Sequence, residues 1–167
     1  MKKLLILILI FTGAAAQGAR PAYRLTSPDG RLTTTVALGD ALTYDIEYDG
    51  QTLMQPSAIG LKLSDGRVWG SSARIAKAVR TSSDAVLSSP FYRSSTVRDH
   101  YNGLTLKMRD NWSVEFRVYD DGVAYRFATT AKDPFEIASE QADYRFPTDC
   151  AVTVPYVRDN AGSIDAQ

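Results

Sequence analysis

An all-β fold, an antiparallel β-sandwich, is the fold class that the sequence predicts, on three observations. Apolar and polar side chains alternate along several stretches, which is the pattern of strands with one buried and one solvated face. Asp-Gly and Asn-Gly pairs stand beside these stretches, and such pairs close tight hairpins because both residues accept left-handed backbone angles. No stretch after the N-terminus shows a convincing helical period. Short strands joined by such turns are typical of a sandwich.

Each alternating stretch supplies one expected strand. In chain order they are residues 31–38, 42–48, 59–63, 104–108, 112–119 and 123–127. Residues 73–80 fit a strand or a helix, because the alanines suit a helix while Ile75 and Val79 suit either. The serine-rich residues 81–83 and 88–89 are expected to be loops. Residues 150–156 predict a last strand, after which the sequence turns polar, so we expect a sandwich that is incomplete at its C-terminus.

The N-terminus predicts a secretory signal peptide over residues 1–16. Two lysines precede an apolar run over residues 4–11, and small residues follow at Ala14 and Ala16. This run is shorter than the roughly 20 residues that a membrane-spanning helix needs. We therefore expect cleavage after Ala16, export to the periplasm or the medium, no membrane association afterwards, and a single domain over residues 17–167.

Charge and cysteine content narrow the function classes. Lys plus Arg equals Asp plus Glu, at 19 each, and the charges are interspersed. Without a basic stripe, nucleic acid is not an expected partner. Cys150 is the only cysteine, so an internal disulfide is excluded. We expect it to be a small buried side chain rather than a catalytic thiol.

The residues that could carry chemistry are few. His100 is the only histidine and no Gly-x-Ser-x-Gly motif is present, so we expect a polar loop or strand-edge histidine. Glycoside hydrolysis needs two carboxylates held across a sugar. Glu47 and Glu115 alternate with apolar neighbours and are expected on solvated strand faces. Glu136 and Glu140 fall in the connection 133–143, where they are either site residues or solvated loop charges.

Aromatic side chains give a weaker indication of sugar binding. The apolar face of a pyranose stacks on exposed rings, and four rings are expected in loops or off the apolar faces: Trp69, Tyr92, Tyr101 and Tyr119. Ordinary core and edge positions are the alternative interpretation for these aromatics.

The order of several short motifs carries a resemblance. They are residues 27–30 (SPDG), 48–50 (YDG), 56–61 (PSAIGL), 101–104 (YNGL) and 116–127 (FRVYDDGVAYRF). In this succession the sequence resembles the N-terminal domain of glycoside hydrolase family 97, from about Pro21 to about Tyr156. The segment 116–127 is the most specific part of the likeness.

The resemblance implies a super-sandwich similar to that of galactose mutarotases, packed against a (β/α)8 barrel. Family members are exported, calcium-dependent enzymes acting on α-glucosides or α-galactosides, and the barrel carries the catalytic groups and most calcium ligands. A barrel needs about 250 residues, and none follow Gln167, so no catalytic, cofactor or metal residue is assigned here. Calcium is expected only for the full-length parent. Tyr101 and Asn102 are the candidate sugar-contacting residues. The family tends to have a glutamate where this sequence has Gly103.

Three functional hypotheses follow. The leading one is a non-catalytic, carbohydrate-associated sandwich of a family 97 enzyme, a truncated fragment that is inactive without its missing barrel domain. The second is a free-standing module that binds an α-linked oligosaccharide. The third is a structural or interaction domain whose exposed edge pairs with a partner.

Overall fold

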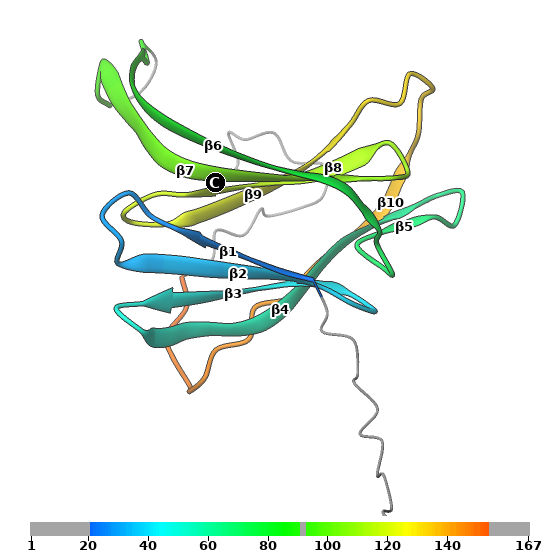
Figure 1. Cartoon of the computed structure of the whole chain (residues 1–167), viewed down its shortest axis with the longest axis horizontal. Coiled ribbons are helices and arrows are strands. Elements are labelled where there is room, and N and C mark those ends of the chain that lie inside the picture. The colour runs from blue at the N-terminus through cyan, green and yellow to red at the C-terminus, as the bar shows by residue number, and fades with distance from the viewer. Residues whose placement is uncertain (1–20, 91–92, 154–167) are drawn as a thin grey trace, which may run out of the picture.

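Two antiparallel sheets packed face to face make up the computed structural model, which describes residues 21–90 and 93–153 (Figure 1). The predicted β-sandwich is confirmed. No described residue is helical, so nothing in these two ranges forms a helix long and apolar enough to cross a membrane. The signal peptide, its cleavage site at Ala16 and Tyr92 lie outside the described residues.

The first sheet has six strands in the order β1-β2-β3-β4-β10, with β5 added against β4. Their bounds are β1 Ala22–Thr26, β2 Leu32–Leu38, β3 Leu42–Tyr48, β4 Gln51–Leu63, β5 Val68–Trp69 and β10 Ile137–Ala142. Asp49 and Gly50 both have positive φ in the turn between β3 and β4, as the Asp-Gly pair predicts.

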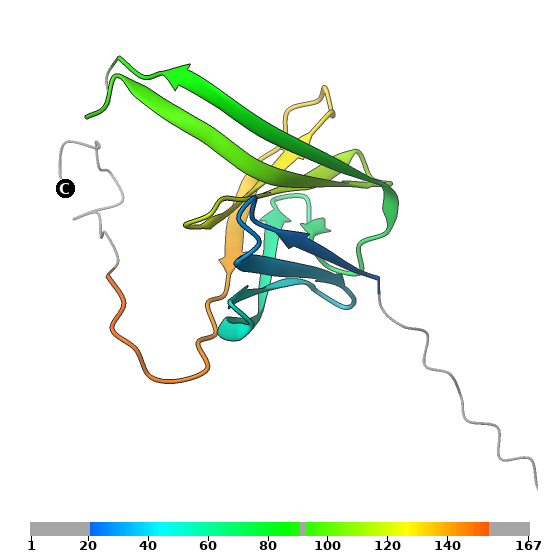
Figure 2. The ribbon, with the colours of Figure 1, turned by 60° about the vertical axis from the view of Figure 1, so that its left-hand side comes forward.

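The second sheet has four strands in the order β6-β7-β8-β9. Their bounds are β6 Ile75–Ser88, β7 Thr96–Met108, β8 Trp112–Val118 and β9 Val123–Thr129. The β6–β7 hairpin is the longest and projects beyond the first sheet (Figure 2). Its far end therefore exposes apolar side chains, among them Val86 and Leu87.

Alternation in the sequence becomes the core of the sandwich. On β8 the side chains of Trp112, Val114, Phe116 and Val118 are buried, and the residues between them are partly exposed. These side chains meet those of β2, such as Val36, which is fully buried. Burying an aliphatic or aromatic side chain of this size stabilises the fold by about 1.5–3 kcal/mol.

An aromatic cluster closes one end of the core. The rings of Trp69 and Trp112 stack with centroids 5.6 Å apart and an interplanar angle of 5°. Phe127 of β9 and Phe135 also pack against Trp69, at centroid distances of 6.5 Å and 5.3 Å. The cluster joins β5 of the first sheet to β8 and β9 of the second, and so links the two layers.

Several local predictions were wrong. The expected loop 81–83 lies in the middle of β6. Residues 73–80 allowed a strand or a helix, and of these the strand forms, from Ile75 onward. The expected connection 133–143 contains β10, which pairs with β4. Residues 150–153 form no strand and Cys150 is exposed, while the rest of that expected strand lies outside the described residues. The strands β6 and β10 are largely exposed on both faces, so alternation could not reveal them.

Candidate functional site

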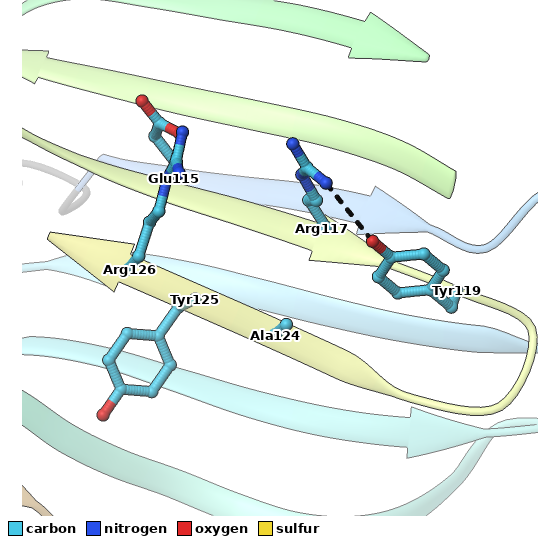
Figure 3. Close-up of a pocket in the computed structure, with 6 residues that line it drawn as sticks. All are labelled: Glu115, Arg117, Tyr119, Ala124, Tyr125 and Arg126. Atoms are coloured by element: carbon cyan, nitrogen blue, oxygen red, sulfur yellow. Dashed lines mark hydrogen bonds and ion pairs between the residues drawn. The ribbon is translucent and has the colours of Figure 1, made fainter. Parts of the chain in front are cut away.

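Polar and aromatic side chains gather on the face of the second sheet that turns away from the core. Because β7 and β8 bury Leu104 and Phe116, their neighbours in the chain point outward. The strand register sets Gly103 opposite Arg117 and Thr105 opposite Glu115. A shallow pocket of about 230 Å³ lies over β8 and β9 on this face (Figure 3).

Tyr101, Arg117, Tyr119 and Asp99 form a connected group that we call the outer platform. The Arg117 guanidinium carbon lies 4.3 Å from the centroid of the Tyr101 ring. The rings of Tyr101 and Tyr119 pack with centroids 5.4 Å apart and are tilted by 53°. A guanidinium over an aromatic face is a favourable electrostatic contact, so the platform holds its cation in place.

Asp99 completes the platform from the N-terminal part of β7. Its carboxylate accepts a hydrogen bond of 3.0 Å from the Tyr119 hydroxyl and lies 3.8 Å from the Arg117 guanidinium. Arg117 in turn donates to the Tyr119 oxygen at 3.4 Å. This hydrogen bond to Tyr119 is the main cause of a raised Arg117 pKa, so the arginine stays charged.

Glu115 and Arg126 form an ion pair beside the platform. The Nε and Nη2 atoms of Arg126 both lie 2.7 Å from Glu115 Oε2, across the β8–β9 pair. Figure 3 shows these two side chains rising from one face of the sheet, while Tyr125 leaves β9 on the other face. Tyr125 packs against Tyr44 and Phe116 in the core, and burial raises its pKa.

The two candidate sugar-contacting residues point to opposite faces of β7. Tyr101 belongs to the outer platform, whereas the Asn102 amide donates a hydrogen bond of 2.8 Å to the Thr26 carbonyl of β1. Asn102 therefore links the two sheets with its side-chain donor. The structure does not bring these residues together on one surface, and sugar contact by either one stays a prediction.

Gly103 follows Asn102 on β7 and lies between Thr81 and the Tyr101 ring, in a place where a side chain would not fit. A β-carbon there would clash with the Thr81 hydroxyl of β6 and would lie 3.2 Å from the Tyr101 ring. Thr81 and Tyr101 thus occupy the space that a side chain would need. The glutamate expected from the family at this position would require both neighbours to move.

The other residues singled out from the sequence are scattered over the fold. Trp69 is 6% exposed in the core, so its expected place off the apolar faces was wrong. Tyr119 lies in the outer platform. His100 lies on β7 rather than in a loop. Its Nδ1 atom lies 3.7 Å from an Asp120 oxygen. Glu140 lies on β10 and Glu136 just before it, and both are exposed.

The carboxylates of this face do not have the geometry of a glycosidase pair. Asp99 is six residues from Thr105, the residue opposite Glu115, which places the two backbones about 20 Å apart along β7. Catalytic carboxyl groups stand about 5–9.5 Å apart. Each of these two is also engaged by an arginine. Among the described residues, no three His, Cys, Asp or Glu side chains are placed to hold a metal ion.

Asp99, Arg117, Glu115 and Arg126 were missed as members of one surface by reasoning from the sequence. A usable signal was present, because the Asp120-Asp121-Gly122 turn fixes the β8–β9 register. That turn sets Glu115 opposite Arg126 on the solvated face. The place of Asp99 on this surface could not be predicted without knowing how far the β6–β7 hairpin extends. The loop expected at residues 81–83 divided that hairpin in the prediction.

A β-sandwich domain with a polar and aromatic outer face is the class of protein that this fold and site define. Comparison with protein families identifies the particular family, because the family model for the glycosyl-hydrolase 97 N-terminal domain matches residues 25–165. The chain belongs to this family.

Known relatives agree with this assignment. A retaining alpha-galactosidase of Bacteroides thetaiotaomicron is 47% identical over 158 residues, which cover 95% of this chain and 24% of the relative. This chain therefore spans about a quarter of the relative's length.

Solved structures show the same fold at lower identity. A glycoside hydrolase family 97 enzyme of Pseudoalteromonas sp. strain K8, in complex with panose, superposes with a TM-score of 0.65 at 22% identity. A beta-arabinopyranosidase superposes with a TM-score of 0.66 at 24% identity. Each match covers 75% of this chain, and 20% and 21% of those chains respectively.

Proposed function

We propose that this chain is the non-catalytic N-terminal sandwich of an exported family 97 glycoside hydrolase that acts on α-galactosides or α-glucosides. In this proposal it is a truncated fragment that supports a (β/α)8 catalytic barrel of the parent enzyme and does not hydrolyse glycosides alone. The observation that carries the proposal is the match of nearly the whole chain to a quarter of an alpha-galactosidase.

The chemistry of the described surface supports a non-catalytic role. The carboxylates of the outer face, Asp99 and Glu115, are held by arginines and lie too far apart to act on one glycosidic bond. In this proposal the expected calcium ion is held by the rest of the parent enzyme. We therefore assign the bond-breaking chemistry to the rest of the parent.

Hydrolysis assays test this proposal directly. The purified chain is expected to release no nitrophenol from nitrophenyl α-galactoside or α-glucoside, with calcium or with a chelator present. Turnover at an enzyme-like rate, of about 1 per second or faster, would contradict a non-catalytic role.

Export is part of the same proposal. The apolar run and the small residues before Gln17 support cleavage after Ala16. N-terminal sequencing of the protein recovered from the periplasm or the medium is expected to begin at Gln17. A protein recovered only from the cytoplasm with Met1 or Lys2 at its N-terminus would contradict export.

A second candidate function is binding of an α-linked oligosaccharide on the outer platform. The adjacent rings of Tyr101 and Tyr119, with Arg117 and Asp99 beside them, combine stacking surfaces with hydrogen-bonding groups. Pockets for sugars and other small ligands commonly combine aromatic walls with a few polar groups in this way. Free-standing glycan binding would require no catalytic barrel.

Calorimetric titration with α-galacto- and α-gluco-oligosaccharides tests the platform. If it binds, Tyr119→Ala should weaken binding about tenfold, because it removes one stacking ring and the hydroxyl that bonds Asp99. Tyr48→Ala is the matched control, since Tyr48 also packs under an arginine, Arg31, but on the first sheet. No heat of binding with the unaltered chain would remove this function.

A further inference from the structure

The open edge of β6 is the longest unpaired strand edge in the part of the chain that the structure describes. β6 lies at the end of the second sheet and pairs only with β7. Its register with β7 is regular from Lys77 to Ser88, and the strand contains neither proline nor glycine. Soluble proteins usually shorten, kink or cover such an edge, since its free backbone groups can pair with another strand.

Apolar side chains at this edge are exposed as well. Val86 is 71% exposed and Leu87 is 49% exposed, although both are of the size that normally packs in a core. They lie next to the turn of the β6–β7 hairpin, because the last residue pair of this hairpin joins Ser88 to Thr96. This end of the hairpin projects beyond the first sheet (Figure 2). The edge therefore offers both unpaired backbone and apolar surface to a partner.

We propose that β6 pairs with β6 of a second copy of this chain, antiparallel about a twofold axis through Ser82. The two four-stranded sheets then join into one continuous sheet across the dimer. In an antiparallel pair, residues whose numbers sum to a constant face each other on the same side of the sheet. With Ser82 on the axis, that sum is twice 82, so a residue a given number of positions before Ser82 faces the residue the same number of positions after Ser82 in the other copy.

The sequence of β6 is complementary to itself in this register. Arg80 of one copy faces Asp84 of the other, Ala78 faces Val86, and Val79 faces Ala85. Twofold symmetry makes each of these pairs occur twice. Opposite-charge and apolar cross-strand pairs are the ones that stabilise a sheet, and no like charges meet here.

Neighbouring registers lose this match. With Thr81 on the axis, Arg80 faces Ser82 and Asp84 faces Ala78. With Ser83 on the axis, Arg80 faces Val86 and Asp84 faces Ser82. Both alternatives lose the two Arg80–Asp84 pairs. The Ser82 register keeps them and is therefore the favoured one, although it sets Lys77 of one copy opposite Leu87 of the other.

Both charged side chains are already oriented within one copy. Arg80 Nη2 donates to the Arg24 carbonyl at 2.7 Å, and Asp84 accepts from Arg98 at 2.8 Å and 3.0 Å. An arginine has further N–H donors and a carboxylate has further acceptor sites, so each can bind the opposite copy without breaking these contacts. Little side-chain freedom remains to be lost on pairing.

Sedimentation of the exported chain over a concentration series to about 1 mM tests the pairing, with expected dimer formation in this range. Arg80→Glu leaves acidic side chains at both position 80 and position 84, which face each other across the axis. Asp84→Arg leaves arginines at both of these positions. Each variant alone should dimerise at least about tenfold more weakly, because its pairs become like-charged. An equimolar mixture of the two should form a heterodimer, because both charge pairs are then opposite in sign.

Lys107→Glu is the matched control, because it makes the same charge reversal on β7 away from the edge, and it should leave the dimer unchanged. Circular dichroism verifies that every variant is folded. A monomer throughout the series, a dimer that ignores both charge reversals, or a mixture that does not form the heterodimer would overturn the proposal.

An independent readout covers the case in which a charge reversal prevents folding. On a Cys150→Ser background, Ser82→Cys places one thiol from each copy beside the axis, and mild oxidation should give a covalent dimer. Ser71→Cys, at an exposed position away from β6, should cross-link far more slowly. Equal rates for the two variants would overturn the proposal.

Discussion

Consecutive residues at the centre of β7 have separate roles, because a strand sends neighbouring side chains to opposite faces. Tyr101 joins the outer platform, and Asn102 holds the β1 carbonyl of Thr26 across the sandwich. Gly103 is required for space, since Thr81 and Tyr101 fill the place of its missing side chain. Sequence reasoning could identify the three residues as a motif but could not divide their roles without the strand register.

Gly103→Ala is expected to destabilise the fold by about 1–3 kcal/mol, because the new methyl group clashes with the Thr81 hydroxyl and approaches the Tyr101 ring. Denaturant unfolding monitored by fluorescence measures the change.

Two comparisons isolate the cause. Gly122→Ala meets nothing within 4 Å and should change the unfolding free energy by less than about 0.5 kcal/mol. Combining Gly103→Ala with Thr81→Ala should lower the cost of the first substitution, because the clashing hydroxyl is gone. Equal costs at Gly103 and Gly122 would show that the close packing has no energetic effect.

Whole strands differ in how well the sequence predicts them. Strands β2, β3, β8 and β9 have one buried and one solvated face, so alternation identified them, and the Asp120-Asp121-Gly122 turn fixed the β8–β9 register. β10 has six exposed residues and most of β6 is exposed, so neither carries that pattern. β5 has two residues, too few for any period, although one of them, Trp69, packs in the core.

Trp69→Ala is expected to lower the unfolding free energy by about 3–5 kcal/mol, because it removes the ring that stacks on Trp112 and contacts Phe127 and Phe135. Thermal and denaturant unfolding measure the loss. Val68→Ala, the neighbouring change on the same two-residue strand, removes a side chain that is 46% exposed and should have a much smaller effect. Similar losses for the two variants would contradict a role for β5 as a link between the sheets.

At the scale of the molecule, the sandwich and its family could be predicted from the sequence because the motif order extends over almost all of the chain. The arrangement of the surface could not be predicted from the sequence, because the outer platform depends on which strands lie side by side. The described fold is a domain with an apolar core, a polar outer face and open strand edges. Such a domain suits a supporting role within the longer enzymes that it resembles.

The central claim, a supporting domain without catalysis of its own, is tested most directly by a chimera. The chain replaces the corresponding quarter of the Bacteroides alpha-galactosidase, and hydrolysis of nitrophenyl α-galactoside is measured for the chimera and for the chain alone. We predict hydrolysis by the chimera and none by the chain. A folded chimera without activity, or turnover by the chain alone, would contradict the claim.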